Sequence, residues 1–214
     1  SHEIRTPLNA IIGFSDMICQ MGEEEEKQEY MKIVSSNNEL LLQLIDDILD
    51  LSKIEAGTME FTFAPTDINE LMEGICRQMQ EKNTSPDVAI TFTEKATECI
   101  FHTDRVRLSQ VIINFTNNAM KFTSEGSIQM GYRIDETKDE IYFYVKDTGI
   151  GIPADKIDEV FERFVKLNTF AKGTGLGLAI CRVIVERLEG TIGANSREGE
   201  GSCFWFRLPM HQKV

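Results

Sequence analysis

Residues 172–180 read KGTGLGLAI, in which alternating glycines lead directly into an apolar helical pattern. Glycines let backbone N–H groups approach an anion closely, and the N-terminus of the following helix favours negative charge. The stretch therefore suits a phosphate group. It lacks the third glycine of the Rossmann spacing and the G-K-[ST] of a P-loop, so a flexible loop before a helix is the ordinary alternative.

A second glycine cluster, DTGIGIPA at residues 147–154, follows a predicted strand. Gly149, Gly151 and Ala154 fit G-x-G-x-x-A, the relaxed dinucleotide fingerprint. That fingerprint belongs to a βαβ unit, whereas the strand before Gly149 is predicted to pair antiparallel with its neighbour. Taken alone, this cluster also favours a loop over a nucleotide site.

A third stretch, NFTNNAMKFT at residues 114–123, places Asn114, Asn118 and Lys121 on one face of a predicted helix. Two amide oxygens and an ammonium on one face can hold a hydrated Mg²⁺ and a phosphate chain. The alternative is a polar, solvated face. Apolar residues are interleaved with the polar ones, so the helix is predicted to be packed and its polar side chains to need partners.

Around these stretches the chain alternates between strand and helix patterns, which predicts an α/β sandwich with a mixed sheet from about residue 58 onward. Asp67 followed by Glu70 predicts a capping box at the start of a helix. Strands are predicted at 59–63, 87–94, 99–103, 127–134, 140–147, 191–196 and 203–209, and helices at 66–80, 104–122, 153–161 and 176–188.

Residues 1–57 are predicted to form a helical hairpin, with Gly57 as a left-handed cap at its end. Its apolar residues recur at three- and four-residue spacing, as in the seam of a bundle. Two helices bury too little surface, so we expect a dimeric four-helix bundle. The seam positions are Ile4, Leu8, Ile11 and Ile18, then Tyr30, Val34, Leu41, Leu44, Ile48 and Leu51. We therefore predict two domains, 1–57 and 58–214.

Composition excludes several classes of protein. The net charge of −13 argues against a nucleic-acid partner. Five scattered cysteines without a C-x-x-C pair indicate reduced thiols in a cytoplasmic protein, and three distant histidines argue against a metal cluster. No apolar run is long enough for a membrane span, so no membrane contact is expected of this stretch. We expect it to be part of a longer protein, for which a membrane anchor remains open.

The ordered set of motifs resembles the catalytic core of a sensor histidine kinase over nearly the whole chain. The resemblance implies a dimeric phosphoacceptor hairpin followed by an ATP-binding domain of the gyrase, chaperone and mismatch-repair type. The matching boxes are the phosphoacceptor box SHEIRTPLN (1–9), the N box NFTNNAMKFT (114–123), the first glycine box DTGIGIP (147–153), the phenylalanine box FERF (161–164), the second glycine box GTGLGLAI (173–180) and the closing segment SREGEGSCFWF (196–206).

For the hairpin, the resemblance implies that His2 accepts the γ-phosphoryl group of ATP and passes it to an aspartate of a response-regulator receiver domain. Glu3 would hold the proton on the other imidazole nitrogen, and Thr6 would orient a hydrolytic water in a phosphatase reaction. Pro7 removes one helical hydrogen bond, so a bend of the helix beside His2 is predicted.

For the second domain, the resemblance implies ATP and Mg²⁺ as cofactors. Asp147 would accept a hydrogen bond from the adenine amino group, Asn118 would bind Mg²⁺, and Asn114 and Lys121 would assist. A lid is expected over about residues 163–174, with Phe161 and Phe164 packing its base. The remaining nucleotide-binding candidates are Gly149, Gly151, Lys172, Gly173, Thr174, Gly175, Leu176 and Gly177.

Two other functions remain open. An ATPase clamp of the same fold would hydrolyse ATP without labelling itself, although the HEIRTP box argues against it. A dimeric scaffold with a decayed site would fail to bind ATP, although Asn118, Asp147 and the glycines are all present.

Overall fold

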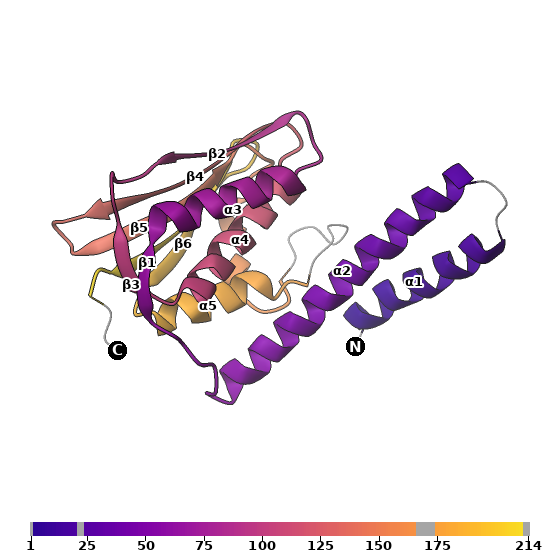
Figure 1. Ribbon diagram of the computed structural model, residues 1–214, viewed down its shortest axis with the longest axis horizontal. Helices are drawn as coiled ribbons and strands as arrows, with labels where there is room; N and C mark the ends of the chain where they lie inside the picture. The colour runs from indigo at the N-terminus through magenta and orange to yellow at the C-terminus, as the bar shows by residue number, and fades with distance from the viewer. Residues whose placement is uncertain (1, 21–23, 166–173, 212–214) are drawn as a thin grey trace. The chain divides into compact units, whose positions relative to one another are not determined.

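The computed structural model describes residues 2–20, 24–165 and 174–211. The chain divides into two compact units (Figure 1). One contains the helical hairpin up to Met59 together with Thr174, and the other is an α/β unit that contains the remaining described residues from Glu60 onward. Each unit is described by itself below. Within the described residues, none of the helices is long and apolar enough to cross a membrane.

The hairpin consists of α1 (His2–Gln20) and α2 (Glu24–Glu55). The two helices pack along each other, and the rings of Phe14 and Tyr30 lie 5.3 Å apart, centroid to centroid. Of the predicted seam, Leu44 is buried, whereas Leu8 and Ile48 are more than a third exposed. The seam within one hairpin is therefore only partly covered.

The helix α2 ends at a glycine cap, as predicted. Gly57 has a φ of +67°, its N–H donates to the carbonyl of Ile54, and the N–H of Thr58 donates to the carbonyl of Lys53. This pair of bonds is a Schellman motif, and it satisfies carbonyls that the end of a helix otherwise leaves without partners.

The α/β unit is built on a five-stranded mixed sheet with the order β2-β4-β5-β7-β6, in which β2 and β4 run parallel and the other neighbours antiparallel. A separate two-stranded sheet pairs β1 with β3. The strands are β1 (Ala64–Asp67), β2 (Val88–Glu94), β3 (Ile100–Thr103), β4 (Gly126–Asp135), β5 (Glu140–Asp147), β6 (Thr191–Arg197) and β7 (Gly201–Pro209).

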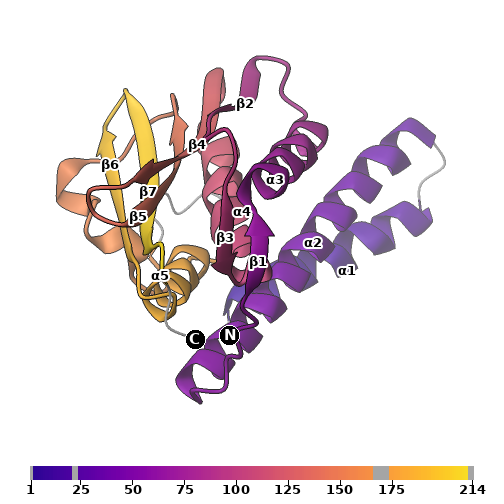
Figure 2. The same ribbon diagram turned by 60° about the vertical axis from the view of Figure 1, so that its left-hand side comes forward.

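Three helices, α3 (Ile68–Lys82), α4 (Arg105–Phe122) and α5 (Gly177–Arg187), cover one face of this sheet (Figures 1 and 2). Phe115 of α4 is fully buried and its ring lies 5.5 Å from that of Phe204 on β7. Asp67 caps α3 by accepting from the N–H of Glu70, as predicted. The predicted α/β sandwich with a mixed sheet after a helical hairpin is confirmed.

One predicted strand was misplaced, because the segment 59–63 is extended without pairing and the strand β1 follows it. The partner strand β3 ends at Thr103, and the next residue, Asp104, caps α4. The N–H of Thr62 therefore meets the Asp104 carboxylate, at 2.7 Å, instead of a ladder carbonyl. The alternating apolar pattern of 59–63 marks burial here, not sheet pairing.

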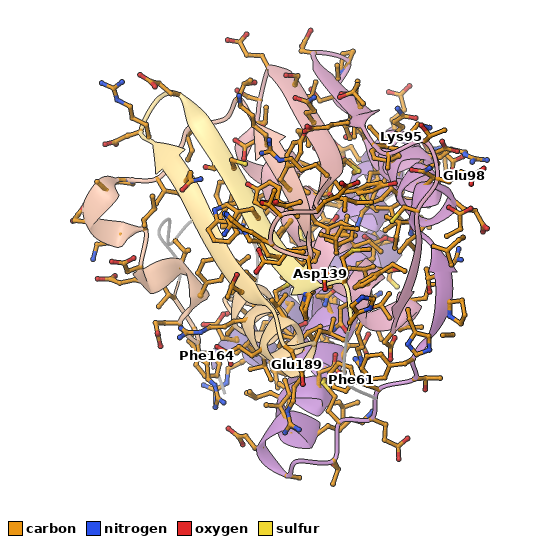
Figure 3. All side chains as sticks on the ribbon, turned by 90° about the vertical axis from the view of Figure 1, so that its left-hand side faces the viewer. Phe61, Lys95, Glu98, Asp139, Phe164 and Glu189 are labelled. Atoms are coloured by element: carbon orange, nitrogen blue, oxygen red, sulfur yellow. The ribbon has the colours of Figure 1, made fainter. Side chains whose placement is uncertain are left out.

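The predicted helix 153–161 is also wrong. The segment forms two 3₁₀ turns, Ala154–Lys156 and Glu159–Phe161, each closed by an i→i+3 backbone bond. So short a segment gains few i→i+4 bonds to offset the cost of nucleating an α-helix. Asp139, Phe164 and Glu189 adopt positive φ at turns and chain reversals, where Figure 3 labels them.

Candidate functional site

The polar face of α4 is present as predicted. The side-chain amide of Asn118 donates to Oδ1 of Asn114 at 3.2 Å, one helical turn away. Both side chains are half-buried, and the Nζ of Lys121 lies 4.8 Å from the ring centroid of Phe122. The bond orients the two amides, so the Oδ1 of Asn118 remains available to a cation.

The start of α5 lies against this face. A Cβ atom at Gly177 would stand 2.2 Å from Nδ2 of Asn114, so a larger residue would collide with the amide face of α4. The N-cap residue of α5, Leu176, makes no side-chain hydrogen bond to the first turn. Because Gly177 begins α5 against Asn114, the N-terminal dipole of this helix lies beside the amide pair of α4, an arrangement that suits an anion with a bound cation.

Asp147 ends β5 and is buried, with 5% of its surface exposed. Its Oδ1 accepts from the backbone N–H of Gly149 at 2.8 Å and of Ser202 at 3.2 Å. Burial raises the pKa of the carboxyl, while these two N–H donors oppose the rise. No described residue donates to Oδ2, so this oxygen is available to a ligand donor.

The glycines around Asp147 permit close contact between segments. Gly149 approaches the end of α4, where a Cβ atom would lie 2.3 Å from the carbonyl oxygen of Phe122. Gly151 has a φ of +68° and lies against the backbone of Arg197. These contacts bring the first glycine box against both α4 and the β6–β7 turn.

The two ends of the predicted lid meet at one backbone bond, from the N–H of Phe164 to the carbonyl of Gly175 at 2.8 Å. Phe161 packs edge-on against Phe204, with ring centroids 6.2 Å apart. Phe164 is 63% exposed, so the prediction that its side chain packs the base of the lid is wrong. Lys172 and Gly173 lie outside the described residues, while Thr174 and Leu176 are buried.

The phosphoacceptor box forms the start of α1. His2 is the first residue of the helix, although its side chain lies outside the described part, and Glu3 is half-buried while Thr6 is exposed. The helix α1 continues through Pro7, which is buried. Glu3 and Thr6 are thus carried by helical backbone, one turn apart.

Two residues beside Asp147 were given no role by the sequence, Ser196 and Ser202. Their hydroxyl oxygens lie 2.9 Å apart across β6 and β7. The closing segment 196–206 that contains both was recognised as a motif, but its spacing does not show that it folds back onto Asp147. The pairing of β7 with β5 brings Ser202 to Asp147, and the pairing of β6 with β7 brings Ser196 to Ser202.

Comparison with known proteins agrees with these features. The profile of the family described as histidine kinase-, DNA gyrase B- and HSP90-like ATPase matches residues 103–212. The profile of the His Kinase A (phospho-acceptor) domain matches residues 1–57.

Among curated proteins, the autoinducer 2 sensor kinase/phosphatase LuxQ of Vibrio vulnificus is 35% identical over 99% of this chain and 26% of its own length. Two solved structures are similar across the chain. Full-length ShkA in complex with AMPPNP has a TM-score of 0.77 and 29% identity, covering 100% of this chain and 45% of ShkA.

Histidine kinase ThkA, solved with response regulator protein TrrA, also has a TM-score of 0.77, with 26% identity over 98% of this chain and 59% of ThkA. The chain spans about a quarter of the length of LuxQ. With both family profiles matched in order and the whole chain aligned to such kinases, this chain belongs to the sensor histidine kinase family, as its phosphoacceptor hairpin and ATP-binding domain.

Proposed function

We propose that this chain transfers the γ-phosphoryl group of ATP to His2 and then passes it to an aspartate of a response-regulator receiver domain. The observation that carries the proposal is the assembly of Asp147, the Asn114–Asn118 pair and the glycines Gly149 and Gly177 within one unit. The name of LuxQ includes both kinase and phosphatase, and ThkA was solved with a response regulator, which supports the same reaction class.

The residues fit a nucleotide with a bound cation. Oδ2 of Asp147 would accept from the adenine amine, and Asn118 would hold Mg²⁺ with help from Asn114 and Lys121. Among the described residues, no three His, Cys, Asp or Glu side chains are grouped as metal ligands, so phosphate oxygens would complete the coordination. When bound, Mg²⁺ neutralises phosphate charge, which is a large part of catalysis in phosphoryl transfer.

The other candidates would surround the phosphates. Gly177 lets the start of α5 lie close to the amide face of α4, because there is no room for a Cβ atom at this position. The remaining members of this group are Gly151, Lys172, Gly173, Thr174, Gly175 and Leu176. Lys172 has two alternative roles, a cationic contact to the phosphates or a stiffening of the lid.

At the phosphoacceptor box, a neutral imidazole has one nitrogen lone pair with which to attack phosphorus. Glu3 would accept a hydrogen bond from the N–H of the other ring nitrogen and so raise the nucleophilicity of His2. A P–N bond forms as the bond from phosphorus to the bridging oxygen breaks, and ADP leaves. The five cysteines are all free, which suits the reducing cytoplasm, where we place this reaction.

The test is incubation with γ-labelled ATP and Mg²⁺. Protonation turns phosphoimidazole into a good leaving group, so label on His2 should be lost in acid and kept in alkali, opposite to a phosphoserine ester. His2→Gln should abolish labelling but keep ATP binding. Acid-labile label on the variant would refute the assignment of His2, and ATP hydrolysis without any label would favour the ATPase clamp.

A second activity, removal of the phosphoryl group from the receiver domain, is favoured by the E-x-x-T pattern of Glu3 and Thr6 on adjacent turns of α1. The Thr6 hydroxyl would orient the attacking water. Thr6→Ala should leave labelling of His2 intact and slow the loss of phosphate from a phosphorylated receiver domain. Equal loss of both activities would instead assign Thr6 a structural role.

A further inference from the structure

The hydroxyl of Ser196 joins three segments next to Asp147. Its Oγ lies 2.8 Å from the backbone nitrogen of Ile152 and 2.8 Å from the carbonyl oxygen of Gly201. It also lies 2.9 Å from the Oγ of Ser202, which is its partner in the β6–β7 ladder. Ser196 thus connects the first glycine box to the strand pair that flanks it.

These three neighbours determine the direction of every hydrogen bond in the cluster. A serine hydroxyl has one proton and two lone pairs. The Gly201 carbonyl can only accept, so Ser196 gives its proton there. The Ile152 N–H can only donate and occupies one lone pair of Ser196. The contact with Ser202 must therefore use the second lone pair, with Ser202 as the donor.

Ser202 consequently has no proton left for a ligand and presents its oxygen as an acceptor. Its side chain lies beside that of Asp147, because Lys146 pairs with Cys203 in the antiparallel β5–β7 ladder. Asp147 follows Lys146 and Ser202 precedes Cys203, so the two residues are opposite each other on the other face of the sheet, toward the helices. The bond from the Ser202 N–H to Asp147 confirms this proximity. No described residue donates to Oδ2 of Asp147 or to any remaining lone pair of Ser202.

We propose that Ser196 is a positioning residue for base selectivity, which holds the Ser202 hydroxyl as an acceptor so that the site prefers a purine with a 6-amino group over a 6-oxo purine. This rests on the proposed function, in which the adenine amine lies at Asp147. An amine has two N–H donors to match the two acceptors, Oδ2 of Asp147 and Oγ of Ser202. A 6-oxo group would face both acceptors without a proton to share.

The test compares the affinities for ATP and inosine triphosphate, which carries a 6-oxo group, by calorimetric titration. In Ser196→Ala, the hydroxyl of Ser202 is free to rotate and donate to the 6-oxo group. The preference for ATP should therefore fall by roughly tenfold, the worth of about one hydrogen bond. Ser196→Thr keeps the hydroxyl and should keep the preference. Ser109→Ala, at a half-buried serine of α4 whose hydroxyl donates to the carbonyl of Arg105, serves as the matched control.

A double-mutant cycle separates this role from a purely structural one. If Ser196 acts through Ser202, Ser196→Ala should not change the preference further in a Ser202→Ala background. If Ser196 only anchors the loop at Ile152, both affinities should fall together with an unchanged ratio, and the inference is wrong. A wild-type protein that binds neither nucleotide would instead contradict the proposed function.

Discussion

At the scale of single residues, Asp147 is a buried carboxylate whose hydrogen bonds from the protein both end on one oxygen. Burial raises its pKa, which means that the folded protein holds the ionised form at a cost. A group with a raised carboxyl pKa contributes most stability below its unfolded pKa, and that contribution is lost as pH rises through the folded pKa. The residue is therefore better suited to recognition than to stability.

We expect ATP affinity to weaken as pH falls through the raised pKa of Asp147, because protonation removes the acceptor for the adenine amine. Asp147→Asn keeps an acceptor for Gly149 and Ser202 but puts an amide donor at the ligand position. The variant should bind ATP weakly at every pH and unfold at the same or a higher temperature at neutral pH. Calorimetric titration and thermal melts across pH measure both effects, and pH-independent ATP affinity in the wild type would contradict the assignment.

Asn118 and its neighbour Asn117 offer a matched pair on α4. Asn118 bonds to Asn114 on the candidate site face, whereas Oδ1 of Asn117 lies 3.4 Å from Nζ of Lys82 on α3. Asn118→Ala should weaken Mg·ATP binding by about tenfold or more, since a ligand of the cation is lost. Asn117→Ala should leave that affinity unchanged. Titration measures both affinities, and equal affinities for Mg·ATP in the two variants would contradict the assignment of Asn118 as a ligand of the cation.

At the scale of elements, the outer face of the sheet depends on glycines opposite aromatic residues. The ladder pairs Gly131 with Tyr144 and Gly193 with Trp205. A Cβ atom at Gly193 would lie 2.4 Å from Cζ2 of Trp205, and one at Gly131 would lie 2.5 Å from the hydroxyl oxygen of Tyr144. The rings occupy the space that side chains would otherwise take, which explains why glycine is kept inside two strands.

Gly193→Ala should therefore displace Trp205 and destabilise the protein by about 1–3 kcal/mol, the usual cost of overpacking. Trp205 is the single tryptophan of the chain, so its emission reports the displacement directly. Gly74→Ala is the control, since nothing lies within 4 Å of that Cβ position on α3. It should stabilise the protein by about 0.5–1 kcal/mol. An unchanged melting temperature and emission in Gly193→Ala would show that the sheet adapts freely.

At the scale of the whole molecule, the hairpin leaves apolar side chains exposed beyond those of its predicted seam. Leu42, Ile45 and Leu49 follow one another at helical spacing on α2 and are 63%, 43% and 53% exposed. A continuous apolar stripe of this kind is typical of an interface. It supports the proposed dimeric bundle, in which we propose that this face of α2 packs against the partner.

Light scattering should report about twice the chain mass of 24.3 kDa. Leu42→Glu should shift the protein toward the monomer, because a carboxylate would have to be buried in the bundle. Lys32→Glu, at an exposed polar position of the same helix, should not. A wild-type monomer at high concentration, or dimers of equal strength in both variants, would contradict the four-helix bundle.

Sequence by itself was sufficient wherever the deciding interaction is local. The Asp67 cap of α3, the Gly57 cap of α2 and the shared face of Asn114 and Asn118 each follow from residues within about one helical turn. Helical geometry fixes such neighbours before any tertiary contact forms. The family was also indicated by the sequence, through the resemblance of its ordered motifs to those of sensor histidine kinases.

Tertiary structure decided what depends on distant partners. The strand β1 begins after 59–63 because its partner β3 ends at Thr103, just before Asp104 caps α4. The sequence around 59–63 gives no sign of where β3 ends. Ser196 and Ser202 gain their place beside Asp147 only when β7 pairs with β5. Strand pairing joins residues far apart in sequence through backbone groups that every residue carries. Side-chain patterns therefore predicted the elements, while the assembled sheet determined which of them meet at the site.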